Sequence, residues 1–492
     1  MSTTTPTRPA VSVRAFNTGR PIIKPSLDAE EFAALAEVED HYAPSALVRL
    51  VTTSFRSGPG AGFHVGHGQY FDFDHVVGRL LGVRGMATSY ASQVYGGGKG
   101  LDLHDAYVSS IGEGMERVLG SFAFLQLSDR MRFGTYDELT AQGLACLGPE
   151  DVPLFSDEQY ADPHFPFDRW EKDAPLGWIA GTRWFSGEEV YVPAQLVLFI
   201  YYPSPEEPLI GLAPSGGLAS HINARRSWLH AIDELFERDA VNLRWHGRVP
   251  LDRIEIDVEP RDPAVSRALD ELADCVGAPQ FFLQSLDVPE FPVVTAIQFD
   301  RWLTELSYNA GGGVGPTVEA AMRSALGEYC QSERSLRIRQ VAHDWQFSIA
   351  FDRLFGIHAD AEPHEFSRFV QAIAYYGYAE RVDQAAWYFE DGGTVALSEL
   401  HAQLDELDPD PYRRMEQTLR SRDIDPIMFD FTLGDLRHTK LTKAFIPELT
   451  PPYPQQSPAL GHPRYRDVPV ATGHRERPLT TGELLADPIP YP

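Results

Sequence analysis

The sequence predicts a mixed fold of helices and sheets, α/β or α+β, with enough apolar material for a large buried core. Hydrophobic residues make up 43% of the 492 residues and aromatic residues 11%, which is typical of a globular chain. Strand-like runs alternate with helical runs, and no short-period repeat interrupts them. Strands are expected at 195–202, 279–286 and 291–299, and long helices at 106–125, 225–243 and 317–336.

The net charge and the cysteines of the chain indicate the compartment in which it works and the kind of partner that it binds. The chain has 42 Lys and Arg against 70 Asp and Glu, a formal net charge of −28, so nucleic-acid binding is not expected. Cys146, Cys275 and Cys330 show no paired spacing, which fits a reducing compartment. The start of the chain lacks an apolar signal core, and the longest apolar run, 196–202, is too short to span a membrane. We therefore expect a soluble cytoplasmic protein.

Composition divides the chain into three segments. Residues 1–60 form an N-terminal segment with one helix at 26–42, where Ser26 is the expected N-cap. Residues 61–445 form the main domain. The last 46 residues hold eleven of the 38 prolines, so 446–492 is expected to be a Pro-rich tail ending in PIPYP. Alternating prolines favour a stiff, extended strand, because each proline fixes its own φ.

The three long helices share a pattern of carboxylates and cationic side chains. These are Glu113, Glu116 and Arg117 in the first helix, Glu234, Glu237 and Arg238 in the second, and Glu328, Gln331 and Arg334 in the third. Spacings of three and four residues place each set on one helix face. A single copy is typical of a solvated helix face. Three copies on apolar-rich helices favour instead a Mg-nucleotide site, since Mg²⁺ takes oxygen ligands from carboxylates and phosphates together and arginines hold phosphate oxygens.

A glycine-rich stretch, GGGKG at 96–100, precedes the first of these helices. Backbone amides in such a stretch can bind an anion at the start of a helix. It is not a Walker A loop, because that loop needs four residues between its glycines and a Ser or Thr after the lysine, whereas Gly100 follows Lys99. On its own the stretch is more typical of a tight turn.

These motifs and their order resemble the YcaO superfamily, whose members bind ATP without a Walker motif. The resemblance covers the chain from about residue 80 to its end. GGGKG with the first helix resembles the first ATP-binding segment of the family, GGLA (216–219) followed by ELFERDA the second, and ALGEYCQSE the third. PIPYP matches the PxPxP terminus of the branch that makes azoline rings in ribosomally made peptides. The implied fold is the YcaO-type fold, with an ATP site between helices and sheets.

The resemblance implies ATP and Mg²⁺ as cofactors and a role for each residue of the helix pattern. The metal-linked carboxylates would be Glu113, Glu116, Glu234 and Glu237, and the nucleotide pocket would contain Ser109, Glu113, Arg117, Arg238, Glu328 and Gln331. The sequence departs from the family at positions 222 and 226, where the family usually has Asn and Glu and this chain has Ile222 and Arg226. Asn223 lies one residue away. In the third segment Glu333 stands where an arginine is expected, and Arg334 follows it.

The resemblance further implies an ATP-dependent peptide cyclodehydratase. A Cys, Ser or Thr side chain of a precursor peptide would attack the preceding backbone carbonyl, and phosphorylation of the amide oxygen would allow a thiazoline or oxazoline to form. Pro488, Pro490 and Pro492 would act in catalysis, because a stiff strand can bring the terminal carboxylate into the site to accept a proton or order water. Two alternatives stay open: a YcaO protein that forms thioamides or amidines, and a degenerate member that only scaffolds a biosynthetic complex.

The resemblance also implies partners. They are the precursor peptide and a separate leader-binding protein, either E1-like or ocin-ThiF-like. An azoline dehydrogenase is a further candidate, and a homodimer is left open. The implied pathway is the biosynthesis of thiazole/oxazole-modified peptide antibiotics. The sequence identifies neither the precursor peptide nor whether Cys or Ser/Thr residues are cyclised.

Overall fold

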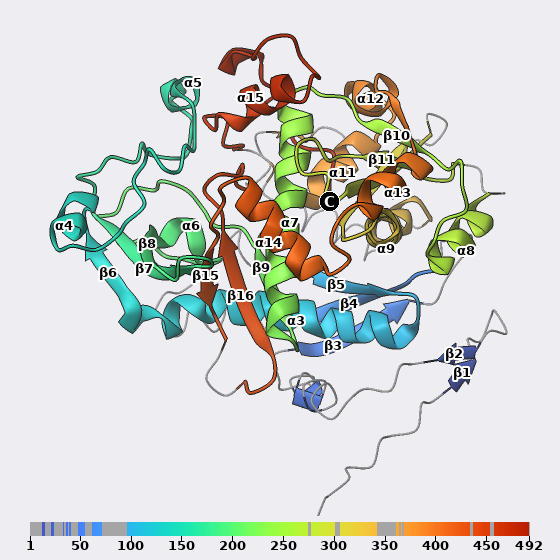
Figure 1. Ribbon diagram of the computed structural model, residues 1–492, viewed down its shortest axis with the longest axis horizontal. Coiled ribbons are helices and arrows are strands. Elements are labelled where there is room, and N and C mark those ends of the chain that lie inside the picture. Colours follow the sequence, from blue (N-terminus) through green and yellow to red (C-terminus); the bar gives the residue numbers. More distant parts are fainter. Residues whose placement is uncertain are drawn as a thin grey trace, which may run out of the picture.

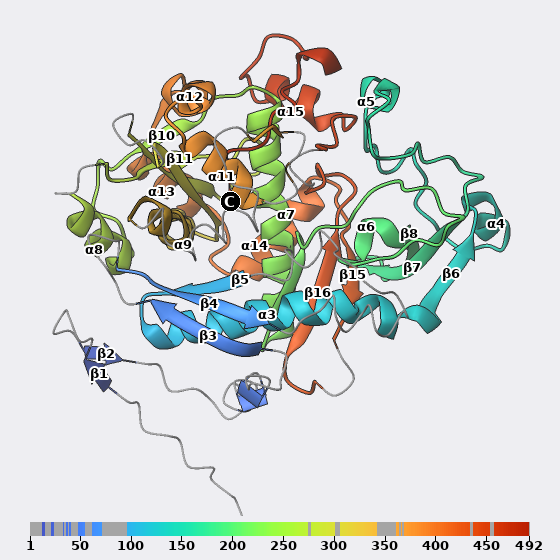
Figure 2. The same cartoon turned by 180° about the vertical axis from the view of Figure 1, so that it is seen from behind.

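A computed structural model arranges the chain around three main sheets and three long helices (Figures 1 and 2). It describes residues 12–14, 21–23, 33, 36–37, 39–40, 48–54, 62–70, 96–273, 277–300, 306–341, 361–363, 366, 369–432, 436–452 and 457–491. The five described residues of the helix expected at 26–42 are helical. Its expected N-cap, Ser26, lies outside the described residues.

The described strands belong to four sheets. They are β1 (Ser12–Arg14), β2 (Pro21–Ile23), β3 (Val48–Ser54), β4 (His64–Tyr70), β5 (Gly96–Gly100), β6 (Met131–Gly134), β7 (Leu176–Arg183), β8 (Glu189–Pro193), β9 (Leu218–His221), β10 (Asp252–Glu255), β11 (Gln280–Leu283), β12 (Val293–Phe299), β13 (Tyr308–Val314), β14 (Thr394–Ala396), β15 (Ile427–Asp430) and β16 (Lys440–Phe445). One sheet has the order β6-β7-β15-β16-β9 with β8 on β7, another β13-β12-β11-β10-β14, a third β3-β4-β5, and β1 pairs with β2.

These pairings define the fold class and three sheet edges. Neighbouring strands are antiparallel except β10 and β14, which are parallel, so the mixed fold predicted from the sequence is confirmed in its α+β form. Within the described residues β5, β9 and β13 each stand at the edge of their sheet. An edge strand has backbone groups that no neighbouring strand uses.

The described α-helices lie around and between these sheets. They are α3 (Leu103–Gln126), α4 (Tyr136–Ala141), α5 (Asp157–Ala161), α6 (Ala194–Val197), α7 (Ala224–His246), α8 (Pro263–Leu272), α9 (Val318–Val341), α11 (Phe369–Gly377), α12 (Val382–Glu390), α13 (Leu397–Asp405), α14 (Pro411–Ser421) and α15 (Arg464–Ala471). The three long helices predicted from the sequence are α3, α7 and α9. Among the helices that the structure describes, none combines the length and the apolar character needed to cross a membrane.

The three long helices bring the three main sheets together. Helix α3 packs against β3, β4 and β5 and also contacts β9, while α9 packs against β12 and β13. Helix α7 stands at the centre of Figure 1, between the sheet that contains β9 and β16 and the sheet that contains β10 and β11. It contacts β9 and β16 of the first sheet and β12 and β13 of the second. The edges of three sheets therefore lie near three helices that carry carboxylates.

Local sequence explains where α3 and α7 begin. Asp102 caps α3, because its side chain accepts hydrogen bonds from two amides of the first turn. Asn223 caps α7, and its side chain accepts from the amide of Arg226 at 3.2 Å. Gly120 lets α3 approach β9 closely, since a Cβ there would lie 2.6 Å from the Leu218 side chain. Gly120 therefore determines how closely α3 packs on β9.

Two sequence expectations about local structure are wrong. The run 195–202 is not a strand: α6 ends at Val197 and the following residues are irregular, although nearly all of the run is buried. The apolar residues of the run correctly indicated that it is buried. They did not indicate its secondary structure, because periodicity cannot distinguish a strand from a helix in a short apolar run. The stretch 96–100 is strand β5 and not a tight turn. The strands expected at 279–286 and 291–299 are confirmed as β11 and β12.

The Pro-rich segment after residue 446 contributes to the core. Leu484 packs with Tyr465 of α15 and with Leu243 of α7. Further on, Leu485 and Ile489 pack in the apolar cluster around Trp245. The last described residues of the chain are therefore buried beside the C-terminal half of α7.

Candidate functional site

Carboxyl groups from three helices gather where α3, α7 and α9 converge. They are Glu113 and Glu116 of α3, Asp233, Glu234 and Glu237 of α7, and Glu328 of α9. Burial raises the pKa of Glu116 and of Glu237, and neighbouring carboxylates raise it further: Glu234 and Glu113 at Glu116, and Glu328 and Glu234 at Glu237. These interactions show that the predicted carboxylates of separate helices share one site.

The two Glu–x–x–Glu–Arg segments have matching geometry. On α3 the Arg117 guanidinium lies 3.6 Å from Glu113 Oε1 and 4.0 Å from Glu116 Oε1. On α7 the Arg238 guanidinium lies 3.8 Å from Glu234 Oε1 and 3.9 Å from Glu237 Oε1. Both sets are loose ion pairs rather than close bidentate ones, so the carboxylate oxygens keep capacity for other ligands.

Backbone amides at three sheet edges orient four of these glutamates. From β5 the Gly97 amide donates to Glu113 (3.1 Å), and from β13 the Gly312 amide donates to Glu328 (3.2 Å). At the β9 edge the Ser220 amide donates to Glu116 (3.2 Å), and the amide of Gly217, just before the strand, donates to Glu234 (2.9 Å). Edge amides that would otherwise be open to another chain are thereby used to position the site.

Glycine is required at these edges because the helices approach the strands so closely. A Cβ on Gly96 would lie 2.6 Å from Glu113 Oε1. A Cβ on Gly97 would lie 3.0 Å from the Gln331 side-chain nitrogen, which brings this predicted residue of α9 to the same corner as Glu113. Gly217 has φ +79°, in the left-handed region that glycine adopts most readily. The GGGKG and GGLA stretches therefore serve as close-packing strand edges.

Two lysines complete the charge balance. The Lys99 ammonium donates to Glu328 at 2.6 Å and so links β5 to α9. Lys443 of β16 is buried, and its ammonium donates to the carbonyls of Pro214 (2.9 Å) and Gly216 (2.6 Å). Burial lowers the pKa of Lys443 to about 8, although Glu234 and Glu116 act in the opposite direction. Lys443 thus supports the turn whose Gly217 amide holds Glu234.

Some sequence-predicted residues do not join this cluster. Ser109 lies on α3 one turn before Glu113 but is exposed, and no described residue bonds its side chain. Arg334 donates to the Phe63 carbonyl at 3.2 Å, beside β4. Asn223 is the helix cap and Ile222 packs in the apolar core, while Arg226 is exposed two turns before Glu234.

The PIPYP segment ends against this site. The Pro488 carbonyl accepts from the Tyr376 hydroxyl at 2.8 Å, and the Pro490 carbonyl accepts from the Tyr308 hydroxyl at 2.6 Å. Pro492 lies outside the described residues. Tyr491 is 2% exposed, and its hydroxyl donates to Glu237 Oε1 at 3.0 Å. Pro488 and Pro490 are therefore anchored through their carbonyls, and among the described residues of the tail the side chain that reaches the site is that of Tyr491.

Sequence reasoning missed four residues of the site: Lys99, Asp233, Lys443 and Tyr491. Lys99 lies in the GGGKG stretch and Asp233 directly precedes ELFERDA, so their closeness to a motif was the available signal for both. Lys443 is more than 200 residues from Gly216, so nothing local connects them.

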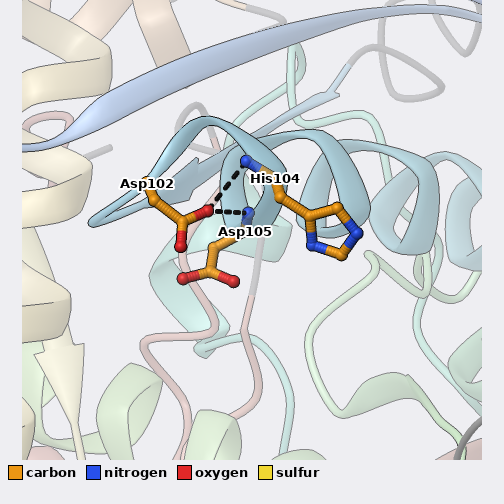
Figure 3. A group of neighbouring side chains, drawn as sticks. All are labelled: Asp102, His104 and Asp105. Atoms are coloured by element: carbon orange, nitrogen blue, oxygen red, sulfur yellow. Dashed lines mark hydrogen bonds between the residues drawn. The ribbon is translucent and has the colours of Figure 1, made fainter. Parts of the chain in front are cut away.

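A second acidic group, at the start of α3, is explained without a ligand (Figure 3). The ligand atoms of Asp102, His104 and Asp105 lie within 4.8 Å of one another. Asp102 Oδ1 accepts from the amides of His104 (2.8 Å) and Asp105 (2.9 Å), which is ordinary helix capping. We assign no site to this group.

Comparison with known proteins identifies the family. A family model described as YcaO cyclodehydratase, ATP- and Mg²⁺-binding, matches residues 97–450, which is most of the chain. The chain belongs to the YcaO family. The resemblance proposed from the sequence is thereby confirmed, and so are ATP and Mg²⁺ as the expected cofactors. Among curated proteins, none has a matching sequence.

Solved structures share the fold at low sequence identity. A heterocyclase in complex with substrate and cofactor is 16% identical, with a TM-score of 0.67 over 98% of this chain. This YcaO chain spans 59% of that heterocyclase's length. YcaO from Methanopyrus kandleri, bound with AMPPCP and Mg²⁺, is 16% identical (TM-score 0.53, 85% of this chain and 88% of that one). The E. coli microcin synthetase McbBCD complex with pro-MccB17 bound is 14% identical (TM-score 0.54, 91% and 98%).

The residues of this YcaO site fit a metal-nucleotide complex. Within the described part of the chain, electrostatic interactions link five of the six carboxyl groups to four cationic groups, Lys99, Arg117, Arg238 and Lys443. The sixth, Asp233, interacts with Glu237. The oxygen donors suit Mg²⁺ and the guanidinium groups suit phosphate. The buried Oδ1 atom of Asp233 has no hydrogen-bond partner among the described residues. A divalent cation would balance the carboxylates once they lose their protons, and it would supply a partner for the unsatisfied oxygen.

Binding of Mg²⁺ and nucleotide to this YcaO protein is expected to release protons. Burial raises the pKa of Glu116 to about 8 and that of Glu237 to about 7, so both bind protons near neutral pH in the metal-free protein. Metal ligands must be deprotonated, and affinity should therefore rise between about pH 6.5 and 8.5. Calorimetry in two buffers of different ionisation enthalpy measures the released protons. Proton release that is absent at pH 7 would contradict this.

The raised pKa of Glu116 also determines how the stability of the folded protein changes with pH. Glu116 has a folded-state pKa above its ordinary value of 4.5, so its stabilising contribution is complete below that value and is lost as pH rises through about 8. The increase in melting temperature that Mg²⁺ and nucleotide produce should accordingly be larger at high pH, because binding replaces the lost protons.

Proposed function

We propose that this YcaO protein is an ATP-dependent cyclodehydratase that forms thiazoline or oxazoline rings in a ribosomally synthesised precursor peptide. The paired Glu–x–x–Glu–Arg sets of α3 and α7 carry the proposal, because they can hold a metal-bound triphosphate from two sides. Membership of a family described as cyclodehydratase supports it, as does the likeness to the heterocyclase fold.

The reaction requires activation of an amide oxygen. A thiol or hydroxyl of the peptide adds to the preceding carbonyl carbon and loses its proton, which leaves a tetrahedral adduct whose oxide cannot depart. That oxygen would take the γ-phosphoryl group of ATP, which acts here as a second substrate, and ADP would remain. The C–O bond then breaks, phosphate leaves, and the former amide nitrogen loses its proton to give the C=N bond of the ring.

The protein contributes placement and charge. Glu113, Glu116, Glu234 and Glu237 would hold Mg²⁺, and Glu328 with Gln331 would complete the nucleotide pocket. Arg117 and Arg238 would bind phosphate oxygens that gain charge during transfer. Ser109, exposed on the same helix face, would contact the nucleotide. Pro488, Pro490 and Pro492 would act in catalysis by holding the tail beside this pocket.

An isotope experiment tests the function directly. A precursor peptide labelled with heavy oxygen at the backbone carbonyl before a Cys, Ser or Thr is incubated with the protein, ATP, Mg²⁺ and the leader-binding partner. We expect heavy phosphate and a peptide lighter by one water per ring. A thioamide or amidine product with heavy phosphate would favour the alternative chemistry. ATP turnover that stays at background would favour the scaffold alternative.

The proposed function requires partner proteins. The precursor peptide would be brought by an E1-like or ocin-ThiF-like leader-binding protein, and a dehydrogenase would oxidise azolines to azoles. The multiprotein assembly named for the McbBCD neighbour supports this arrangement by analogy alone. The ring-forming assay run with and without the leader-binding protein tests it, because activity without that protein would remove the requirement.

A further inference from the structure

The Glu237 carboxylate differs from the other glutamates of the site in what orients it. Glu113, Glu116, Glu234 and Glu328 each accept a hydrogen bond from a backbone amide at a sheet edge. In the part of the chain that the structure describes, Glu237 accepts instead from the Tyr491 hydroxyl, at 3.0 Å. A side chain of the tail thus takes the place that an edge amide takes at the other four glutamates.

Close packing fixes the Tyr491 ring in this position. The ring is 2% exposed, and the Arg238 guanidinium lies over it, 5.4 Å from its centroid. A Cβ on Gly312 would lie 1.4 Å from the phenol oxygen, so the bare backbone of β13 makes room for the hydroxyl. Tyr491 therefore contacts α7 and β13 at the point where Glu237 meets Glu328.

The tail is anchored by contacts that do not involve the Tyr491 phenol. The Trp245 indole donates to the Asp487 carbonyl at 2.8 Å, and the Tyr376 hydroxyl donates to the Pro488 carbonyl at 2.8 Å. The Tyr308 hydroxyl donates to the Pro490 carbonyl at 2.6 Å. Removal of the Tyr491 hydroxyl alone should therefore leave the tail in place.

We propose that Tyr491 is a positioning residue that orients Glu237 for metal binding and so makes the nucleotide site depend on the seated tail. The inference rests on the proposed function, in which Glu237 is a metal ligand. Among the described residues of the tail, the Tyr491 hydroxyl is the group that bonds this ligand. A hydroxyl that holds a metal ligand typically changes metal affinity about 10–100-fold when it is removed.

The test compares Tyr491→Phe with Tyr388→Phe. Each variant removes one buried phenol hydrogen bond, but the Tyr491 hydroxyl donates to a site carboxylate, whereas the Tyr388 hydroxyl donates to the Gln284 side chain at 2.9 Å. We expect Tyr491→Phe to weaken Mg²⁺-dependent binding of a non-hydrolysable ATP analogue about tenfold or more, and Tyr388→Phe to leave it within about twofold. Calorimetry with the analogue and a titration with Mn²⁺ measure binding without peptide or partner, and melting temperatures report folding.

A double-mutant cycle separates the inference from the proposed function. In a Glu237→Gln background, Tyr491→Phe should cause little further loss, because the orienting bond has lost its carboxylate. Equal binding by Tyr491→Phe and the wild type, or equal losses in both tyrosine variants, would overturn the positioning role. A wild-type protein that fails to bind the analogue at all would overturn the proposed function instead.

Discussion

Replacement of Glu116 or Glu237 by glutamine is expected to lower peptide-dependent ATP consumption more than about a hundredfold. The amide keeps the size of the side chain but removes an anionic ligand. Stability should not fall with activity, because burial already raises the pKa of Glu116 to about 8 and a neutral amide removes that electrostatic cost. Steady-state ATP turnover with partner and peptide, together with melting curves, measures both effects.

A surface glutamate provides the matched control for these variants. Glu158 is exposed in the first turn of α5, far along the chain from the site helices, and Glu158→Gln should keep wild-type turnover. Near wild-type activity in both Glu116→Gln and Glu237→Gln would reject the site formed by the three helices. Loss of activity together with a large drop in melting temperature would show that the carboxylates serve folding.

The helices and their carboxylates could be predicted because their signals are local. Glu113, Glu116 and Arg117 stand three and four residues apart, so any helix that contains them presents them together. The same spacing on α7 places Glu234, Glu237 and Arg238 alike. The shared spacing therefore explains why both sets can form the same ion pairs.

The way in which the carboxylates are held could not be predicted, because it depends on how separate sheets meet. The glycines of β5 suggested a turn, since a glycine run has no periodicity and permits many backbone conformations. Only the packed sheets show that β5, β9 and β13 are edges whose amides face helices. Similarly, Asn223 lies one residue from the position where the family usually has Asn, but its side chain accepts a hydrogen bond from an amide of the first turn of α7.

Contacts between distant parts of the chain account for the remaining differences. Lys99 and Glu328 are 229 residues apart, and Tyr491 and Glu237 are 254 apart. No local pattern encodes such pairs. In the tail, the repeated prolines drew attention to a stiff backbone, whereas the residue between the last two of them reaches the site.

Removal of the buried ammonium group of Lys443 is expected to have the second large effect, a loss of nucleotide affinity. Lys443→Met is expected to weaken binding of Mg²⁺–ATP roughly ten- to a hundredfold, since hydrogen bonds from a charged group and its compensating charge are both lost. The carbonyls of Pro214 and Gly216 would lose their donor, and the turn that carries the Gly217 amide would relax. Binding of a fluorescent ATP analogue at pH 7, where Lys443 is mostly protonated given a pKa of about 8, measures the loss.

A lysine on the same strand is the control that makes this result specific. Lys440 begins β16 and is half-buried, three positions from Lys443 and therefore on the other face of the strand. Lys440→Met should bind the analogue as the wild type does. If Lys443→Met lowers the melting temperature but binds nucleotide with wild-type affinity, Lys443 only supports the turn, and the positive charge needed beside Glu234 and Glu116 is supplied by Arg117 and Arg238. If affinity falls while the melting temperature shifts by no more than a few degrees, the buried ammonium belongs to the nucleotide site, although its strand lies far along the chain from all three helices.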